Sequence, residues 1–252
     1  MTDIGVERGA DHVATVEIRR PPENFFDATL IADLAGAVED LAGNGDTRAV
    51  VLCSEGRHFC AGANLGRGGE GADETARLYA AAVRLFRQPL PIVAAVQGAA
   101  VGGGLGLALA ADLRVAAPEA RFAANFSLLG FHPGFGISVT LPRFVGPQAA
   151  LELLTTGRRI DGEEALRVGL ADRLVPAGEL RDAAHALAAE IAAAAPLAVR
   201  AIRATLRGDL ADQVAAAVDH ERAEQHRLMR TDDFREGVTA VAERRPGRFT
   251  GR

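Results

Sequence analysis

The stretch Gly98-Ala-Ala-Val-Gly-Gly-Gly-Leu-Gly-Leu-Ala-Leu-Ala-Ala-Asp112 decides the fold of this chain. It follows a short β-branched run, Ile92–Val96, which is typical of a buried strand. The glycines Gly102–Gly104 let the backbone turn and leave its N–H groups uncovered by side chains. Residues 105–111 then continue as a helix that is apolar on almost every side, and therefore buried. Because the first N–H groups of a helix lack partners and its dipole is positive there, we predict a site that stabilises negative charge.

Two other interpretations of this stretch are open. The glycines also suit close packing of a strand against a helix, with no chemistry. The segment from Gln88 to Ala111 contains no charge, as a membrane span would. However, Pro89, Pro91 and the glycines break it into strand, turn and helix, so we expect a buried core and no contact with a membrane.

Composition narrows the class of protein. The 252 residues suit one large domain, or one domain with a helical appendage, and 24% charged with 48% apolar residues are typical of a soluble globular protein. The net charge of −5 gives no reason to expect a nucleic acid partner, and no cluster of metal ligands is visible. Cys53 and Cys60 predict free buried thiols in a reducing compartment. The first residues show no export signal, so we expect a cytoplasmic protein.

Apolar periodicity predicts an α/β protein whose strands crowd the first half and whose helices fill the last third. Strand, strand and helix recur loosely, as in a spiral of ββα turns. The best candidate boundary lies near Pro196, which predicts a core domain over residues 1–195 and a helical region over residues 196–252. The predicted strands are 13–18, 48–53, 92–96, 113–117, 121–126 and 171–175, and the predicted helices are 28–41, 73–87, one from about 137, 179–194 and 210–229.

Several motifs match one known family. Phe59–Leu65, Gly98–Asp112, Leu129–Gly134 with Leu141–Gly146, and Thr231–Gly237 together resemble the enoyl-CoA hydratase/isomerase (crotonase) superfamily, in the right order and over nearly the whole chain. The resemblance implies a crotonase-like fold of repeated ββα units with a C-terminal helical region, which serves oligomerisation and covers the site, assembled as a homotrimer or homohexamer. It also implies an acyl-CoA substrate, with coenzyme A as part of the substrate and no other cofactor.

The resemblance also implies where the thioester binds. By position, the backbone amides of Ala63 and Gly103 bind the thioester oxygen, and two such donors stabilise an enolate or a tetrahedral oxyanion. One donor of this kind is typically worth ~3–4 kcal/mol in rate, and the helix dipole adds to the second. Small residues beside Ala63 let the thioester approach the backbone. The other predicted substrate-binding residues are Ala61, Gly62, Leu65, Gly102, Gly106, Phe126, Gly134 and Arg20.

The chain departs from the family at its acid/base residues. Hydratases of this family place glutamates at the positions of Gly106 and Phe126, and a third carboxylate station of the family falls on Gly134. Hydration needs groups that activate water and move a proton, which glycine and phenylalanine cannot do. We therefore expect hydrolysis or decarboxylation in preference to hydration.

His132, in the loop that borders the acyl pocket in the family, is the best candidate to replace these carboxylates. A lone histidine in an apolar loop also often just hydrogen-bonds the backbone. Tyr79, the only tyrosine, is a second candidate, although packing with an exposed hydroxyl also explains it. Two rival functions stay open: a catalytically silent acyl-CoA-binding protein, and a hydratase that uses Glu70 or Glu74 from a loop over the substrate.

Overall fold

A computed structural model describes residues 3–64 and 72–252, and within them the main sheet has six strands. β1 (Ile4–Arg8) pairs antiparallel with β2 (Val13–Ile18), and every later neighbour in this sheet pairs parallel. The order continues from β2 through β3 (Ala49–Ser54), β4 (Ile92–Val96) and β6 (Leu113–Ala116) to β9 (Arg173–Leu174). A smaller sheet joins β5 (Ala99–Val101), β7 (Arg121–Ala123) and β8 (Arg159–Ile160).

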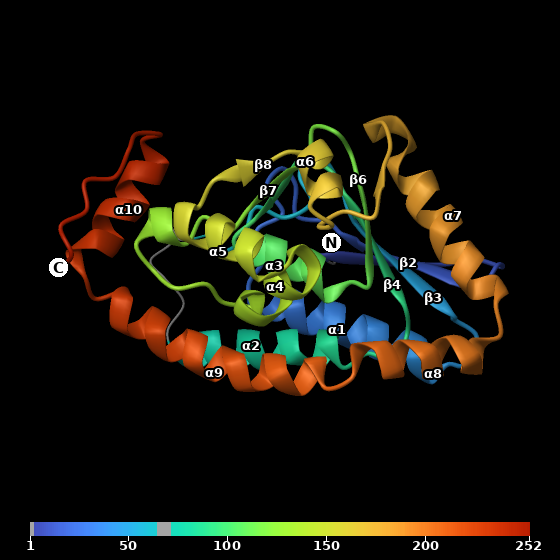
Figure 1. Ribbon diagram of the computed structural model, residues 1–252. Coiled ribbons are helices and arrows are strands. Elements are labelled where there is room, and N and C mark those ends of the chain that lie inside the picture. The colour runs from blue at the N-terminus through green and yellow to red at the C-terminus, as the bar shows by residue number, and fades with distance from the viewer. Residues whose placement is uncertain (1–2, 65–71) are drawn as a thin grey trace.

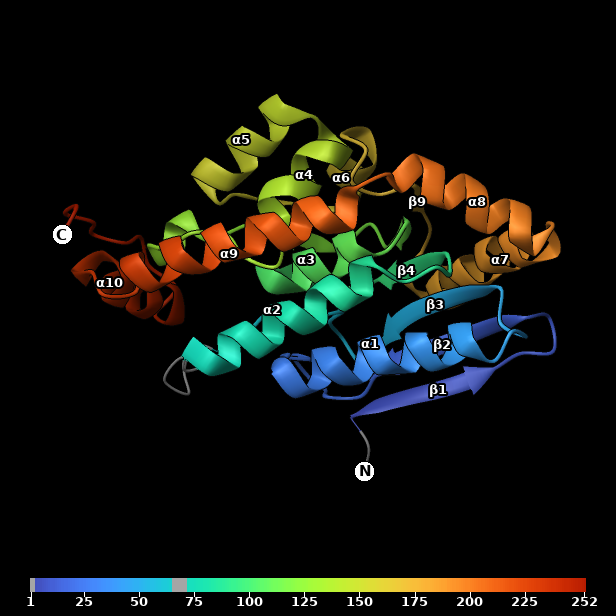
Figure 2. The same ribbon diagram turned by 90° about the horizontal axis from the view of Figure 1, so that it is seen from below.

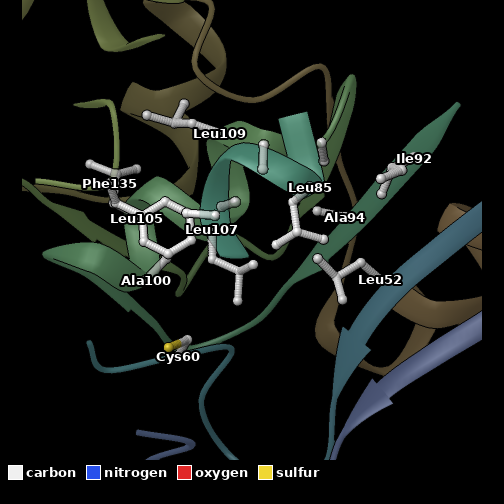
Figure 3. Close-up of a cluster of buried hydrophobic side chains, with 14 of the residues drawn as sticks. Leu52, Cys60, Leu85, Ile92, Ala94, Ala100, Leu105, Leu107, Leu109 and Phe135 are labelled. Atoms are coloured by element: carbon white, nitrogen blue, oxygen red, sulfur yellow. The ribbon is translucent and has the colours of Figure 1, made fainter. Parts of the chain in front are cut away.

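The main sheet is covered on both faces (Figure 1). Successive side chains of a strand point to opposite faces, so Leu52 and Ala94 join a core with α1 (Ala28–Gly43), α2 (Ala72–Phe86) and α3 (Gly103–Ala110). Val51 and Val93 join the second core, under α7 (Leu180–Ala193). Burial on both faces explains why these parallel strands are almost continuously apolar. Figure 3 shows Leu105, Leu107 and Leu109 of α3 in one cluster with Leu52 and Ala94 of the first core.

The last helices return over the elements that surround the glycine turn. α8 (Pro196–Arg207) leads into α9 (Leu210–Leu228), and Figure 2 shows α9 passing between α2 and α4 (Ile137–Val145), which it contacts. α10 (Asp232–Ala242) packs on the short turn of 3-10 helix at Ser127–Leu129. In the described ranges the remaining α-helices are α5 (Pro147–Thr156) and α6 (Gly162–Arg167). The division into residues 1–195 and 196–252 stays a prediction.

The predicted α/β architecture is confirmed, with three local corrections. The strand predicted over 121–126 ends at Ala123, because the chain turns into the 3-10 helix after Phe126. The strand predicted over 171–175 shrinks to Arg173–Leu174. The short strands β1, β5 and β8 were not predicted. In the described part of the chain, no single helix is long and apolar enough to cross a membrane, and the bent pair Ala177–Ala193 with Pro196–Arg207 passes only by length and composition.

The two cysteines are free and buried, as predicted. Burial raises the pKa of Cys53 to about 11 and that of Cys60 to about 12, and only the thiolate is nucleophilic. We expect a disulfide reagent to titrate neither thiol in the native protein near neutral pH, and both after unfolding in guanidinium. Rapid reaction of either thiol in the folded protein would contradict this burial.

Candidate active site

The glycine turn begins α3 with unpaired backbone donors. Gly102 has φ 54° and ψ −124°, a conformation that glycine adopts without strain. Its N–H donates to the carbonyl oxygen of Ala123 at 2.8 Å, and its own carbonyl accepts from Leu105 and Gly106 at 3.0 and 3.3 Å. Within the described residues the N–H of Gly103 has no acceptor, as expected in the first turn of a helix.

The segment from Phe59 to Asn64 lies alongside β5, and Cys60 pairs with Ala100. The N–H of Cys60 donates to the carbonyl oxygen of Ala99 at 2.8 Å, and that of Val101 donates to Cys60 at 3.1 Å. A Cβ on Gly104 would lie 2.1 Å from the carbonyl oxygen of Cys60, so the start of α3 is pressed against this segment. Glycine at position 104 therefore serves close packing of the backbone.

Gly62 has φ +94°, a conformation that favours glycine. Its carbonyl oxygen accepts from the N–H of Phe26 at 3.0 Å. Because the peptide group is planar and trans, the N–H of Ala63 points away from Phe26. A Cβ on Gly62 would lie 2.8 Å from the carbonyl oxygen of Val101 and 3.8 Å from the nitrogen of Gly103. Gly62 therefore lies in close contact with the glycine turn.

The two amides belong to residues that are partly exposed, although the glycines beside them are buried. Ala63 and Gly103 are partly exposed, whereas Gly62, Gly102 and Gly104 are buried. Within the described residues the N–H of Ala63, like that of Gly103, has no acceptor in the chain. Two such donors, one of them at the positive end of a helix dipole, can bind an oxygen atom on which negative charge develops.

Aromatic side chains pack on the backbone behind Gly103. A Cβ on Gly103 would lie 2.3 Å from Cζ of Phe26, and the rings of Phe26 and Phe135 are 5.7 Å apart. A Cβ on Gly106 would lie 2.8 Å from Cβ of Phe135, which lies beside Leu105 in Figure 3. Position 106 therefore has no room for a side chain while Phe135 is in place. Neither of these contacts was predicted.

The second family station is also apolar. Phe126 is only 4% exposed, and its ring packs on Phe131 at a centroid distance of 5.5 Å. Phe131 in turn packs on Phe234 of α10 at 5.4 Å. Position 126, where the resemblance implies a glutamate, is therefore filled by aromatic packing.

Tyr79 and Gly134 are brought together, with a glutamine that the sequence analysis missed. A Cβ on Gly134 would lie 2.0 Å from the Tyr79 hydroxyl oxygen. This hydroxyl is buried and donates to Oε1 of Gln225 at 2.6 Å, rather than meeting solvent. The Nε2 of Gln225 donates to the carbonyl oxygen of His132 at 3.0 Å, so α9 connects α2 with the loop at residues 131–136.

His132 lies toward α9. Its Nδ1 is 2.9 Å from the carbonyl oxygen of Pro133, so Nδ1 carries the hydrogen and Nε2 is the basic nitrogen of the neutral ring. The ring packs edge-on against the exposed His220 of α9, with centroids 5.6 Å apart. The hydrogen bond from the histidine to the backbone, which the interpretation without chemistry predicts, is therefore present. It occupies Nδ1 and leaves Nε2 as the basic nitrogen.

The remaining candidates are less central. Ala61 donates its N–H to the carbonyl oxygen of Glu23 at 3.0 Å. Arg20 already holds two carboxylates, Asp3 at 2.6 Å and Asp27 at 2.8 Å. Glu74, in the first turn of α2, is 3.6 Å from the guanidinium of Arg77. Leu65 and Glu70 lie outside the described residues. No group of three His, Cys, Asp or Glu in the described ranges could hold a metal ion.

The sequence analysis also missed Asn24 and Glu221, two buried polar side chains. The Nδ2 of Asn24 donates to the carbonyl oxygens of Glu55 and His58 at 2.8 and 2.6 Å, which holds the chain before Phe26 against the chain before Cys60. Glu221 and Gln225 continue the apolar stripe of Leu210, Val214 and Val218 at helical spacing. Polar residues that continue an apolar stripe were the signal in the sequence from which the burial of Glu221 and Gln225 could have been predicted.

Comparison with known proteins agrees with this architecture. The family model for enoyl-CoA hydratase/isomerase matches residues 8–252. A Mycobacterium tuberculosis protein named probable enoyl-CoA hydratase EchA14 is 41% identical over 223 residues, 86% of each chain. The carnitinyl-CoA dehydratase of Proteus mirabilis is 35% identical over 95% of each chain. A crystal structure of an enoyl-CoA hydratase/isomerase from Pseudoalteromonas atlantica has a TM-score of 0.87 at 30% identity, covering 99% of this chain and 100% of its own.

This α/β spiral with a C-terminal helical region is thus the crotonase fold, as predicted. The chain belongs to the enoyl-CoA hydratase/isomerase family. The names of these relatives state hydration or dehydration, and they give no support to the hydrolysis or decarboxylation that the sequence analysis favoured.

Proposed function

We propose that this protein is an enzyme that binds an acyl-CoA thioester and stabilises an enolate or oxyanion with the N–H groups of Ala63 and Gly103. The observation that carries the proposal is the placement of these two amides, each without an acceptor in the described part of the chain and each partly exposed. Backbone donors of this kind are fixed before substrate arrives, so each lowers the barrier by ~3–4 kcal/mol without reorganisation. Family membership supports the acyl-CoA as substrate.

The reaction that follows is proposed to be hydrolysis or decarboxylation. Hydration by paired glutamates would need carboxylates at positions 106 and 126. The chain has Gly106 and Phe126 there, against which Phe135 and Phe131 pack. Nε2 of His132 is the proposed base, because Nδ1 is bonded to Pro133. Tyr79 is the second candidate for proton transfer.

A second candidate function is a silent acyl-CoA-binding protein, in which the two amides only recognise the thioester. The closed packing of Phe135 on Gly106 favours it, because it removes a station for proton transfer. A hydratase that uses Glu74 is less favoured, since this carboxylate lies beside Arg77.

We also propose that the chain assembles as a homotrimer or homohexamer. The supporting observation is that α8 exposes three large apolar side chains to solvent in the single chain: Leu197, Ile202 and Leu206.

The function is tested with purified protein and a panel of acyl-CoA thioesters, including crotonyl-CoA and a 2-carboxyacyl-CoA. We expect thioester binding, release of free thiol or carbon dioxide from one member, and hydration of crotonyl-CoA far below that of a hydratase with both glutamates. His132→Ala should lower turnover by ~10²–10⁴-fold, the usual contribution of a general acid or base.

Each result separates the alternatives. Hydration at the rate of the two-glutamate enzyme would overturn the proposed reaction. Unchanged turnover in His132→Ala would overturn the role of His132. Binding without turnover of any thioester would favour the silent binding protein, and no binding at all would overturn the proposed site.

A further inference from the structure

We infer that Glu221 of α9 is a positioning residue that fixes the Gly103 amide through the loop at residues 131–136, which leads into α4. The inference rests on the proposed function, because it concerns the amides that bind the thioester oxygen. Glu221 is 0% exposed, although it lies on a helix whose other acidic residues are partly or fully exposed. A buried carboxylate is retained only where hydrogen bonds compensate its lost hydration.

The carboxylate of Glu221 binds the start of α4. Its Oε2 accepts from the N–H of Gly136 at 2.8 Å, and its Oε1 accepts from the N–H and the hydroxyl of Ser138 at 3.1 and 2.5 Å. Gly136 is the N-cap of α4, and Ser138 lies in its first turn. The negative charge is thus placed at the positive end of the α4 dipole, and it satisfies donors that the helix leaves unpaired.

One helical turn further along α9, Gln225 holds the other end of the same loop. It donates to the carbonyl oxygen of His132 at 3.0 Å and accepts from Tyr79 at 2.6 Å. The loop is therefore fixed to α9 before and after Phe135. Between these attachments Phe135 has φ +62°, a conformation that a phenylalanine rarely adopts. Such strain persists only where the surroundings determine it, and the two α9 side chains supply those surroundings.

The held conformation of Phe135 reaches the candidate active site. Its Cβ closes over Gly106 of α3, and its ring packs on Phe26. Phe26 in turn lies against Gly103, since a Cβ there would be 2.3 Å from its ring. Contacts therefore run from Glu221 through the loop and two aromatic rings to Gly103, whose N–H is one of the two proposed donors. Movement of Phe135 would let Phe26 and the first turn of α3 shift together.

Acetoacetyl-CoA is the probe for this inference. Its enolate absorbs in the near ultraviolet, and part of the negative charge of the enolate lies on the thioester oxygen that the amides would bind. Two quantities are measured: the dissociation constant by calorimetry and the bound enolate fraction by absorbance. Glu221→Gln keeps the shape of the side chain, but both Glu221 oxygens accept from N–H groups, so an amide NH2 there faces a donor. Glu224→Gln, on the partly exposed side of α9 where Glu224 pairs with Arg227 at 2.6 Å, is the matched control.

For folded Glu221→Gln we expect the ratio of bound enolate to bound keto form to fall by about tenfold, since a misplacement of ~1 Å can cost ~10²-fold. Glu224→Gln should match the wild type. A purely structural role would lower the melting temperature and leave this ratio unchanged below it, and that result would overturn the inference. If Glu221→Gln does not fold, Ser138→Ala, which removes only the 2.5 Å bond, must lower the ratio partially, and no change would overturn the inference.

Failure of the proposed function gives a different pattern. If the wild type binds no acetoacetyl-CoA, or binds it without forming enolate, the amides of Ala63 and Gly103 do not act as proposed. If the wild type forms enolate and Glu221→Gln forms it equally well, only the positioning role is wrong.

Discussion

Replacing Ala63 with proline should lower turnover of the protein's acyl-CoA substrate by ~10²–10³-fold, the loss seen when one oxyanion donor is removed. Proline lacks the N–H that we propose to bind the thioester oxygen. In the described part of the chain this N–H has no acceptor, so its removal breaks no hydrogen bond of the fold. Gly62, which precedes it, tolerates the restriction that proline places on its neighbour.

The measurement is kcat and KM with the substrate found in the thioester panel, together with the melting temperature. Ala63→Ser keeps the backbone N–H and adds one hydroxyl, so it is the matched control and should stay close to the wild type. The proposal predicts that most of the loss in Ala63→Pro falls on kcat, because the negative charge on the thioester oxygen is larger in the transition state than in the ground state. Wild-type kcat in a folded Ala63→Pro would exclude this amide from the reaction.

Much of the fold could be predicted because local patterns report it. The strands Val13–Ile18 and Ile92–Val96 are apolar runs, and α1 has apolar residues at helical spacing, so each was placed to within a few residues. β5 and β8 have three and two residues, too few for any period to show. Their existence depends on pairing with β7, which is a nonlocal contact.

The candidate site divides in the same way. The assignment of the amides of Ala63 and Gly103 is implied by the family resemblance, which rests on motifs that are local in sequence, and it stays a prediction. The contact of Phe26 with Gly103 joins residues far apart in the chain, and no local sequence pattern near either residue predicts it. Glu221 meets Gly136 and Ser138 across a similar separation. A charged residue on a helix is usually solvated, so only the fold could show that this one is buried.

Gly106→Glu, which places a glutamate where the family resemblance implies one, should destabilise the protein by more than ~4 kcal/mol, because it combines overpacking with an unpaired buried charge. The first atom of the new side chain would lie 2.8 Å from Cβ of Phe135 and 2.9 Å from its ring. Gly106 is itself buried within α3, whose neighbours are apolar. Equilibrium unfolding in guanidinium measures the loss.

The matched variant is Gly106→Glu combined with Phe135→Gly. Removing the ring opens the space above position 106, and glycine accepts the φ of +62° without strain. We expect the double variant to regain a large part of the stability lost in the single variant, although a cavity beside Phe26 offsets some of the gain. A single variant as stable as the wild type would show that Phe135 moves aside freely, and the closed packing over Gly106 would then be no barrier to a catalytic carboxylate. A double variant no more stable than the single one would show that the buried charge, and not Phe135, forbids glutamate at this position.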